Sequence, residues 1–284
     1  MIKIMKKNLL LLLLFLTSLS VYSQGKEKIR GSKIVTITQQ ETKEFENLEV
    51  EDNLEIFLIK GDKSAIEIEA DDNLHDVIKV DFSEKTLTLS TNKEISGAKK
   101  LSVRVTYTND LKMVMAKDDA NVTALSAIKL NDFTFKSFDY AKIFAYVETQ
   151  TFTLMANDKS KLEINLKSTV SSTIELSKSA SIKGLISTPK LTFDMYQKTS
   201  ATVEGDTNDL KLRIDNDADF VGKNLITKNA DLSVEGYADC SIQVSTKALI
   251  SIGGNSELQL YGEPKTIELL KFSEKSTLYK KTLK

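Results

Sequence analysis

The sequence predicts an all-β protein built as a parallel β-helix, with about 20 residues in each coil. Short runs of three to five residues alternate between apolar and polar side chains, which is typical of half-buried strands. A small residue recurs at a nearly constant interval from Ala120 onward. No segment after residue 24 shows a long helical period. Units of this size cannot bury an apolar face alone, whereas stacked units can.

Residues 1–23 have the pattern of a secretory signal peptide. Lys3, Lys6 and Lys7 precede the apolar run "NLLLLLLFLTSLS", and Val21 and Ser23 occupy the −3 and −1 positions of a cleavage site. The apolar run is shorter than the roughly 20 residues of a membrane-spanning helix. We therefore expect export to the periplasm, the outer-membrane surface or the medium, with no integral membrane span after cleavage.

The composition of the mature chain excludes several classes of protein. Without the signal peptide, 36 basic residues face 40 acidic residues, a net charge of −4, which argues against a nucleic-acid partner. One cysteine in an exported chain means no internal disulfide. Two prolines and eleven glycines mark no obvious linker, so one continuous domain is expected.

Residues 24–110 are predicted to form N-terminal coils or a capping sheet of the same solenoid. The alternation is clear at "LEVEDNLEIFLIK", and the strands are longer than those that follow. Turn residues at "KGDKS" (60–64) and "FSEKT" (82–86) predict two hairpin-like turns. Terminal repeats of a solenoid are usually atypical.

Residues 111–284 are predicted to form regular β-helix coils with a C-terminal cap. The recurring small residues predict one tight corner per coil, and they are Ala120, Ala141, Ser160, Ala180, Ala201, Ala218, Cys240, Ser256 and Ser276. If the interpretation is correct, residues such as Ala141, Ala180, Ala201 and Cys240 should lie above one another. The basic segment "LKFSEKSTLYKKTLK" (270–284) is predicted to cap the last coil and to discourage edge-to-edge pairing.

The chain resembles a known family, the putative auto-transporter adhesin, head GIN domain proteins of bacteria. The resemblance depends on the opening "FENLEVEDNLEIFLIKGDKSAIEIEADDNLHDVIKV", the tandem short units and the closing "YGEP" (261–264). It implies a right-handed parallel β-helix that is secreted or held at the cell surface, with no established activity. The family's units carry a glycine just before the small residue, whereas Asp, Lys or Asn stands there in most units of this chain, and "GGNS" is the nearest match.

The only histidine and the only cysteine offer little chemistry. His75 would have to serve any Ser/His/Asp or Cys/His system, but its surroundings, "NLHDVI", read as a strand-linking turn. Cys240 occupies a small-residue position that other units fill with Ala or Ser, which predicts corner packing. Metal sites built from His and Cys are excluded by count. We predict no catalytic residue, no metal ligand and no cofactor.

The carboxylates are the only cluster of side chains that could support catalysis or cation binding. Asp215, Asp217 and Asp219 in "DNDAD" are predicted to share the outward face of one strand. Further acids lie near the predicted corners, at Asp118, Asp119, Asp139, Asp158 and Asp239, and a stack of acids could hold calcium. Lysines interleave with them at Lys136, Lys159, Lys178 and Lys198, which favours solvated surface residues. Whether Asp215, Asp217 or Asp219 binds a cation stays open at this stage.

These observations predict an exported, non-catalytic β-solenoid that serves as an adhesin-like binding or structural module of the cell envelope. Its partner would be a protein or a glycan at the cell surface. The alternative is a carbohydrate-active enzyme, a polysaccharide lyase or hydrolase on a β-helix, with carboxylates in an outer cleft. The small residues follow one another too closely to leave a long loop that could wall such a cleft. Tyr140, Tyr196 and Tyr237 could stack on sugars but are scattered.

Overall fold

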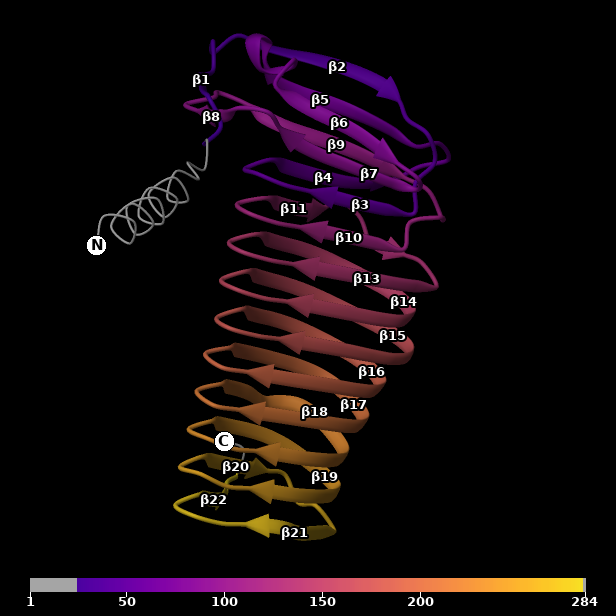
Figure 1. The fold of residues 1–284 in the computed structure, drawn as a ribbon. Helices are drawn as coiled ribbons and strands as arrows, with labels where there is room; N and C mark the ends of the chain where they lie inside the picture. The colour runs from indigo at the N-terminus through magenta and orange to yellow at the C-terminus, as the bar shows by residue number, and fades with distance from the viewer. Residues whose placement is uncertain (1–24, 283–284) are drawn as a thin grey trace, which may run out of the picture.

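The computed structural model describes residues 25–282, and the chain forms one elongated stack of strands (Figure 1). The predicted signal peptide, residues 1–23, lies outside the described residues. The only helix within residues 25–282 is a three-residue 3-10 turn, Asp72–Leu74. The described residues therefore contain no helix that is long and apolar enough to cross a membrane.

The N-terminal strands are β1 (Lys28–Arg30), β2 (Val35–Glu41), β3 (Asn47–Val50), β4 (Glu55–Lys60), β5 (Ala65–Asp71), β6 (Ile78–Ser83), β7 (Thr86–Thr91), β8 (Glu94–Ser96) and β9 (Leu101–Tyr107). The repeating part begins with β10 (Met113–Ala116), β11 (Asn121–Ala124), β12 (Ile128–Lys129), β13 (Asp132–Ser137), β14 (Lys142–Ala156), β15 (Lys161–Leu176) and β16 (Ser181–Tyr196). It ends with β17 (Ser200–Asp215), β18 (Asp219–Val234), β19 (Asp239–Ile252), β20 (Glu257–Tyr261), β21 (Thr266–Phe272) and β22 (Thr277–Lys280).

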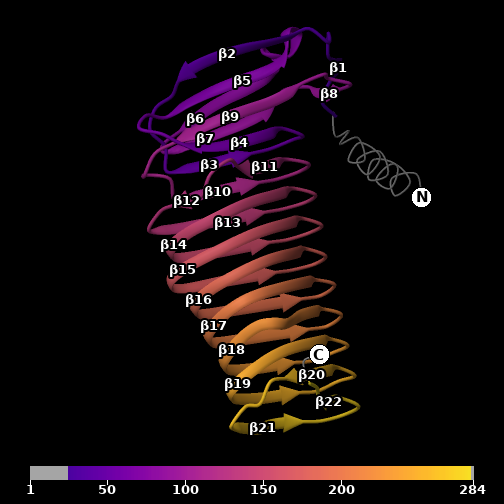
Figure 2. The same cartoon turned by 180° about the vertical axis from the view of Figure 1, so that it is seen from behind.

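The chain forms a β-solenoid with parallel coils about 20 residues apart, as the sequence predicts, and it has about eight turns. Strands β14 to β19 each supply a complete coil, because each bends once and so contributes to both flat faces of the stack (Figures 1 and 2). Every coil pairs in parallel with the next, in a register that places Leu154, for example, beside Ile174 and Ile174 beside Phe193. Inward rows of apolar side chains therefore fill the interior along the whole axis.

One corner of each coil is a left-handed turn two residues before the small residue. Positive φ angles between 55° and 82° recur at Asp118, Asp139, Asp158, Lys178, Gln197, Asn216, Gly236, Gly254 and Glu274. Such angles cost an L-residue about 1–2 kcal/mol, and Asp and Asn tolerate them better than most. The stack offsets this cost, because the carbonyl oxygen of the turn residue accepts a bond from the next coil, as in Tyr140 N–H to Asp118 O at 2.8 Å. The corner therefore keeps one geometry although glycine occupies only two of the nine positions.

The small-residue row was predicted correctly at seven positions and wrongly at two. The carbonyl oxygens of the corner residues accept N–H bonds of 2.8–3.2 Å from the next coil, and these residues are Ala120, Ala141, Ser160, Ala180, Thr199, Ala218, Ala238 and Ser256, with Ser276 next in the series. Thr199 and Ala238, not Ala201 and Cys240, belong to this row. Ala201 and Cys240 lie two residues later, on either side of Phe220 in the first inward row of the strand.

The opposite corner is lined by buried hydroxyl groups, a feature that the predictions above do not include. Thr149, Ser168, Thr188, Thr207 and Thr227 lie in neighbouring coils at this bend and are all at most 6% exposed. Three of these hydroxyls donate to the carbonyl two residues ahead, for example Thr149 to Thr151 at 2.9 Å. Because these bonds satisfy a buried polar group at a bend, the strand can turn without an open loop.

The N-terminal end is covered by antiparallel strands on a continuous core. β2 pairs with β5 and β5 with β9, while β9 pairs in parallel with β4, which leads into the coils. "FSEKT" is a true two-residue hairpin between β6 and β7. "KGDKS" is not, because β4 and β5 both pair with β9, which lies between them. The interior beneath this end is closed by Leu74, which is fully buried.

A buried carboxylate holds the ends of this covering together. Asp71 accepts bonds from the backbone N–H groups of Lys33, Lys99 and Lys100 at 2.8–3.1 Å. Burial acts to raise the pKa of Asp71, but the N–H donors of Lys100, Lys33 and Lys99 outweigh it and lower the pKa below its ordinary value. This carboxylate therefore stabilises the fold above its unfolded-state pKa, and the contribution is lost as the pH falls through the lower folded-state pKa.

Candidate binding groove

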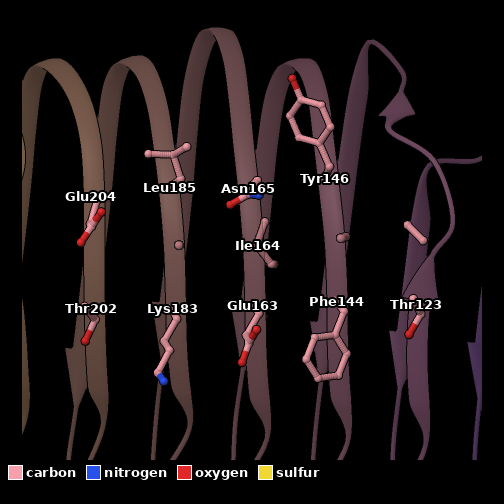
Figure 3. Close-up of a pocket in the computed structure, with 13 residues that line it drawn as sticks. Thr123, Phe144, Tyr146, Glu163, Ile164, Asn165, Lys183, Leu185, Thr202 and Glu204 are labelled. Atoms are coloured by element: carbon pink, nitrogen blue, oxygen red, sulfur yellow. The ribbon is translucent and has the colours of Figure 1, made fainter.

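A groove crosses five coils on one flat face of the solenoid. It has a volume of about 570 Å³ and is formed by β11, β14, β15, β16 and β17. Figure 3 shows two rows of outward side chains, one running from Thr123 through Phe144, Glu163 and Lys183 to Thr202, the other containing Tyr146, Asn165, Leu185 and Glu204. The four spacings between five coils, at about 4.8 Å each, give a length of roughly 19 Å.

The floor between the two rows is low because its residues face inward and three of the four are small. They are Ala124, Ala145, Ile164 and Gly184. A strand places alternate side chains on opposite faces, so these floor residues turn their side chains toward the core and present mainly backbone to the groove. The parallel register repeats this arrangement from coil to coil and produces a continuous channel rather than isolated dents.

The groove combines apolar and polar side chains. Tyr146 is 43% exposed and Leu185 is 54% exposed, so both offer apolar surface to a ligand in the groove. The carboxylate of Glu148 interacts with the hydroxyl of Tyr146 and raises the pKa of the tyrosine. The same interaction, together with Lys129 at 3.0 Å, lowers the pKa of the glutamate.

The other face carries an uncharged row of outward side chains. Thr134, Thr153, Thr173 and Thr192 are aligned across four coils, and Lys211 interrupts the row in the fifth. All four threonines are half-buried. Thr192 and Lys211 also line a second hollow on this face, with a volume of about 320 Å³. It is smaller than the groove, so the groove is the better candidate site.

The carboxylates of "DNDAD" do not share one strand face, contrary to the prediction. Asp215 ends β17, Asp217 lies in the corner turn, and Asp219 begins β18. Asp217 lines a hollow formed with Lys178 and Lys198, whereas Asp219 lines a different hollow. Asp215 accepts the N–H of Asn216 at 2.8 Å. The three acids therefore lie at separate places and not on one face of a strand.

The acids near the corners are involved in turn stabilisation. Asp118 accepts the N–H of Asp52 at 3.0 Å, and Asp139 accepts that of Asp118 at 3.3 Å. Asp158 pairs with Lys178 at 2.6 Å. Asp119 is exposed in the turn that contains Asp118. Among residues 25–282, no group of three or more His, Cys, Asp or Glu side chains could hold a metal ion.

Asp219 lies in register with Asp239 of the next coil, so the two carboxylates are neighbours. Desolvation and, second, the charge of Asp239 raise the pKa of Asp219. A raised folded-state pKa means that the ionised form destabilises the fold above that pKa, and the penalty disappears as the pH falls below the unfolded-state value. We expect Asp219→Asn to raise the melting temperature at neutral pH and to have little effect near pH 3. Asp217→Asn is the control, and a lower neutral melting temperature for Asp219→Asn would contradict the assignment.

Cys240 is expected to be chemically inert in the folded protein. It is 2% exposed, and burial together with the charges of Asp219 and Asp239 raises the pKa of its thiol well above the ordinary value. The thiol should react with a disulfide reagent only after unfolding, so its labelling rate should follow the unfolding rate measured by circular dichroism. Rapid labelling of native protein would show that the position is open.

His75 and the predicted sugar-stacking tyrosines do not converge on a site. His75 follows the 3-10 turn, where its ring lies 2.9 Å and 3.1 Å from the hydroxyls of Thr36 and Thr38. Tyr140 and Tyr237 occupy equivalent corner positions in distant coils. Tyr196 packs against Arg213, and Tyr140 against Lys159, with each cation 5.0 Å from the ring centroid.

Comparison with known families identifies the chain. A model of the putative auto-transporter adhesin, head GIN domain family matches residues 44–264, from just before β3 to the "YGEP" segment. The protein belongs to this family. The head GIN domain match covers most of the N-terminal covering, the whole groove and most of the stack, and it agrees with the resemblance seen in the sequence.

Solved structures share the fold of this head GIN domain protein. A putative adhesin from Parabacteroides merdae is 16% identical with a TM-score of 0.61, covering 91% of this chain and 100% of the other. A putative adhesin from Parabacteroides distasonis is 13% identical with a TM-score of 0.64, covering 90% and 98%. A putative lipid binding protein from the same species is 12% identical with a TM-score of 0.63, covering 91% and 100%. No curated protein matches the chain by sequence.

Proposed function

We propose that this protein is an exported, non-catalytic, adhesin-like module that binds an extended glycan at the cell envelope. The observation that carries the proposal is the five-coil groove, with aromatic and polar side chains in two parallel rows. Membership of an adhesin-like family supports a binding role. The signal-peptide pattern of residues 1–23 supports export.

The chemistry of the groove fits a sugar chain. A pyranose ring has an apolar C–H face, which packs on Tyr146, Phe144 or Leu185, and an edge of hydroxyls, which bond to side chains such as Asn165. The groove is built on strands that are paired on both edges, so little conformational entropy is lost when a ligand binds.

The two glutamates of the groove are the acids that the enzymatic alternative would use. Glu163 and Glu204 lie in β15 and β17, two coils apart and in different outward rows. Coil and strand spacings place their Cα atoms roughly 12 Å apart. Hydrolases hold their two carboxyl groups about 5–9.5 Å apart, a separation that glutamate side chains can reach from these Cα positions. Turnover therefore needs a measurement of its own.

Binding can be tested on a glycan array, followed by calorimetry with any glycan that binds. We expect Tyr146→Ala to weaken binding by about tenfold, because stacked aromatic residues dominate such contacts. Tyr237→Ala removes an even more exposed ring that does not line the groove and should have no effect. Equal losses from the two variants, or no glycan binding by the wild type, would contradict the proposal.

The enzymatic alternative and a lipid ligand need separate measurements. Incubation with a panel of acidic polysaccharides should yield no new reducing or unsaturated ends. Products that disappear in Glu163→Gln, or in the triple Asn variant of Asp215, Asp217 and Asp219, would show a carbohydrate-active enzyme instead. Binding of lipid vesicles that is unaffected by Tyr146→Ala would point away from the groove.

A further inference from the structure

The C-terminal end of the solenoid exposes its interior rows. Ile267, Leu269 and Phe272 of β21 stand in register with Ala248, Ile250 and Ile252 of β19, which are fully buried. The three β21 side chains are nevertheless 45–53% exposed, and Leu270 beside them is 57% exposed. Part of the predicted cap, 270–284, completes β21 and forms β22, which are themselves the last strands of the stack.

The free edge of β21 needs a strand as its partner. Within residues 25–282, β21 pairs only with β19, so its other edge presents unpaired N–H and C=O groups next to the apolar side chains. A lipid bilayer could cover the side chains but could not satisfy these backbone groups. A strand from another protein chain satisfies both requirements.

The sequence of β21 is complementary to itself. In an antiparallel pair of two copies centred between Leu269 and Leu270, Ile267 faces Phe272 of the second copy. Glu268 then faces Lys271 of the second copy, twice in each pair. Leu270 is the bulged residue of the strand, and the bulge lies at this centre. Within one chain Glu268 already contacts Lys247 at 3.3 Å, and Lys271 contacts Glu235 at 2.9 Å. Pairing of two copies would connect these ion pairs into continuous rows in which acidic and basic side chains alternate.

The two ends of the stack differ in a way that favours a closed dimer. At the N-terminal end the interior is closed by Leu74 and Val77, at 0% and 4% exposure, beneath the antiparallel strands. Stacking through the C-terminal ends therefore leaves the covered ends of the two stacks facing outward. A two-fold axis uses the same surface on both copies and closes after two.

We propose that two copies of this protein associate end to end through antiparallel pairing of their β21 strands. The pairing buries the exposed apolar row and satisfies the free backbone edge. It does not depend on the ligand of the groove, so its failure and that of the proposed function are distinguishable. A dimer would carry two grooves and so could bind a repetitive surface with avidity.

Sedimentation equilibrium over a micromolar concentration range tests the proposal. We expect a monomer–dimer equilibrium in the wild type. Glu268→Lys places like charges at both contacts and should weaken dimerisation at least about tenfold. The double variant Glu268→Lys with Lys271→Glu should recover most of it. Glu263→Lys makes the same charge change at the same end, outside β21, and should leave dimerisation unchanged.

Cross-linking gives a second readout that does not depend on charge. In the double variant Ile267→Cys with Phe272→Cys, mild oxidation should produce a covalent dimer, because the two positions face each other only between copies. A wild type that stays monomeric, a charge exchange that fails to restore the dimer, or anionic vesicles bound by monomers through Leu269 and Leu270 would each overturn the proposal.

Discussion

Gly205→Ala is expected to destabilise the middle of the solenoid by at least about 3 kcal/mol. Gly205 has a φ of 115°, a region that is strained for any residue with a side chain. A Cβ at this position would lie 2.2 Å from the carbonyl oxygen of Ile186 in the neighbouring coil. The clash is with backbone, so it can be relieved only by separating two coils and breaking their ladder of hydrogen bonds. Urea unfolding monitored by circular dichroism measures the loss.

Gly184→Ala is the matched control for this prediction. Gly184 lies in the preceding coil with an ordinary φ, and a Cβ there would lie 3.0 Å from the carbonyl oxygen of Ile164. We expect a loss of about 1 kcal/mol or less, because a small shift is sufficient. If the two variants unfold at the same urea concentration, the backbone at Gly205 does not have the conformation described.

Phe193→Ala is expected to cost about 3–5 kcal/mol. Phe193 and Phe220 are both fully buried, and their rings meet edge to face with centroids 5.3 Å apart. They come from opposite faces of the stack, in β16 and β18, so the pair joins the two sheets across the interior. Removing one ring leaves a cavity that the close-packed rows cannot refill.

A double-mutant cycle separates this contact from simple loss of volume. Phe193→Ala, Phe220→Ala and the double variant should give a coupling energy of about 0.5–1.5 kcal/mol for the ring pair. Tyr237→Ala, which removes an exposed ring, should change stability by less than about 0.5 kcal/mol. Additive losses from the two phenylalanines would show that the rings contribute only through their buried area.

The packing of Phe220 also explains why the corner row was misread at two coils. In a strand, residues two apart face the same way, so Thr199 and Ala201 both point inward, as do Ala238 and Cys240. Sequence alone therefore could not distinguish the corner from the next inward position. Ala201 and Cys240 are small because they flank the ring of Phe220, which reaches across to Phe193, and not because they form the bend.

The corner with the buried hydroxyls also has a recurring pattern in the sequence. Ser or Thr recurs once per coil, at positions 149, 168, 188, 207 and 227. Hydroxyl residues are also common on outward faces, so only their burial and their bonds to carbonyl oxygens show that they form a bend. The groove left no such signal, because its walls come from residues with no shared type, such as Phe144, Glu163 and Lys183.

The amino-acid sequence by itself determined the all-β class, the length of the repeating coil and seven of the nine corner positions. These properties follow from local alternation and from the small size that a tight bend demands, both of which can be read along the chain. The tertiary structure alone decided which outward rows form a groove, that the acids of "DNDAD" diverge, and that β21 keeps an open edge. Each of these depends on the register between coils, because register sets side by side residues that lie a full coil apart in the sequence.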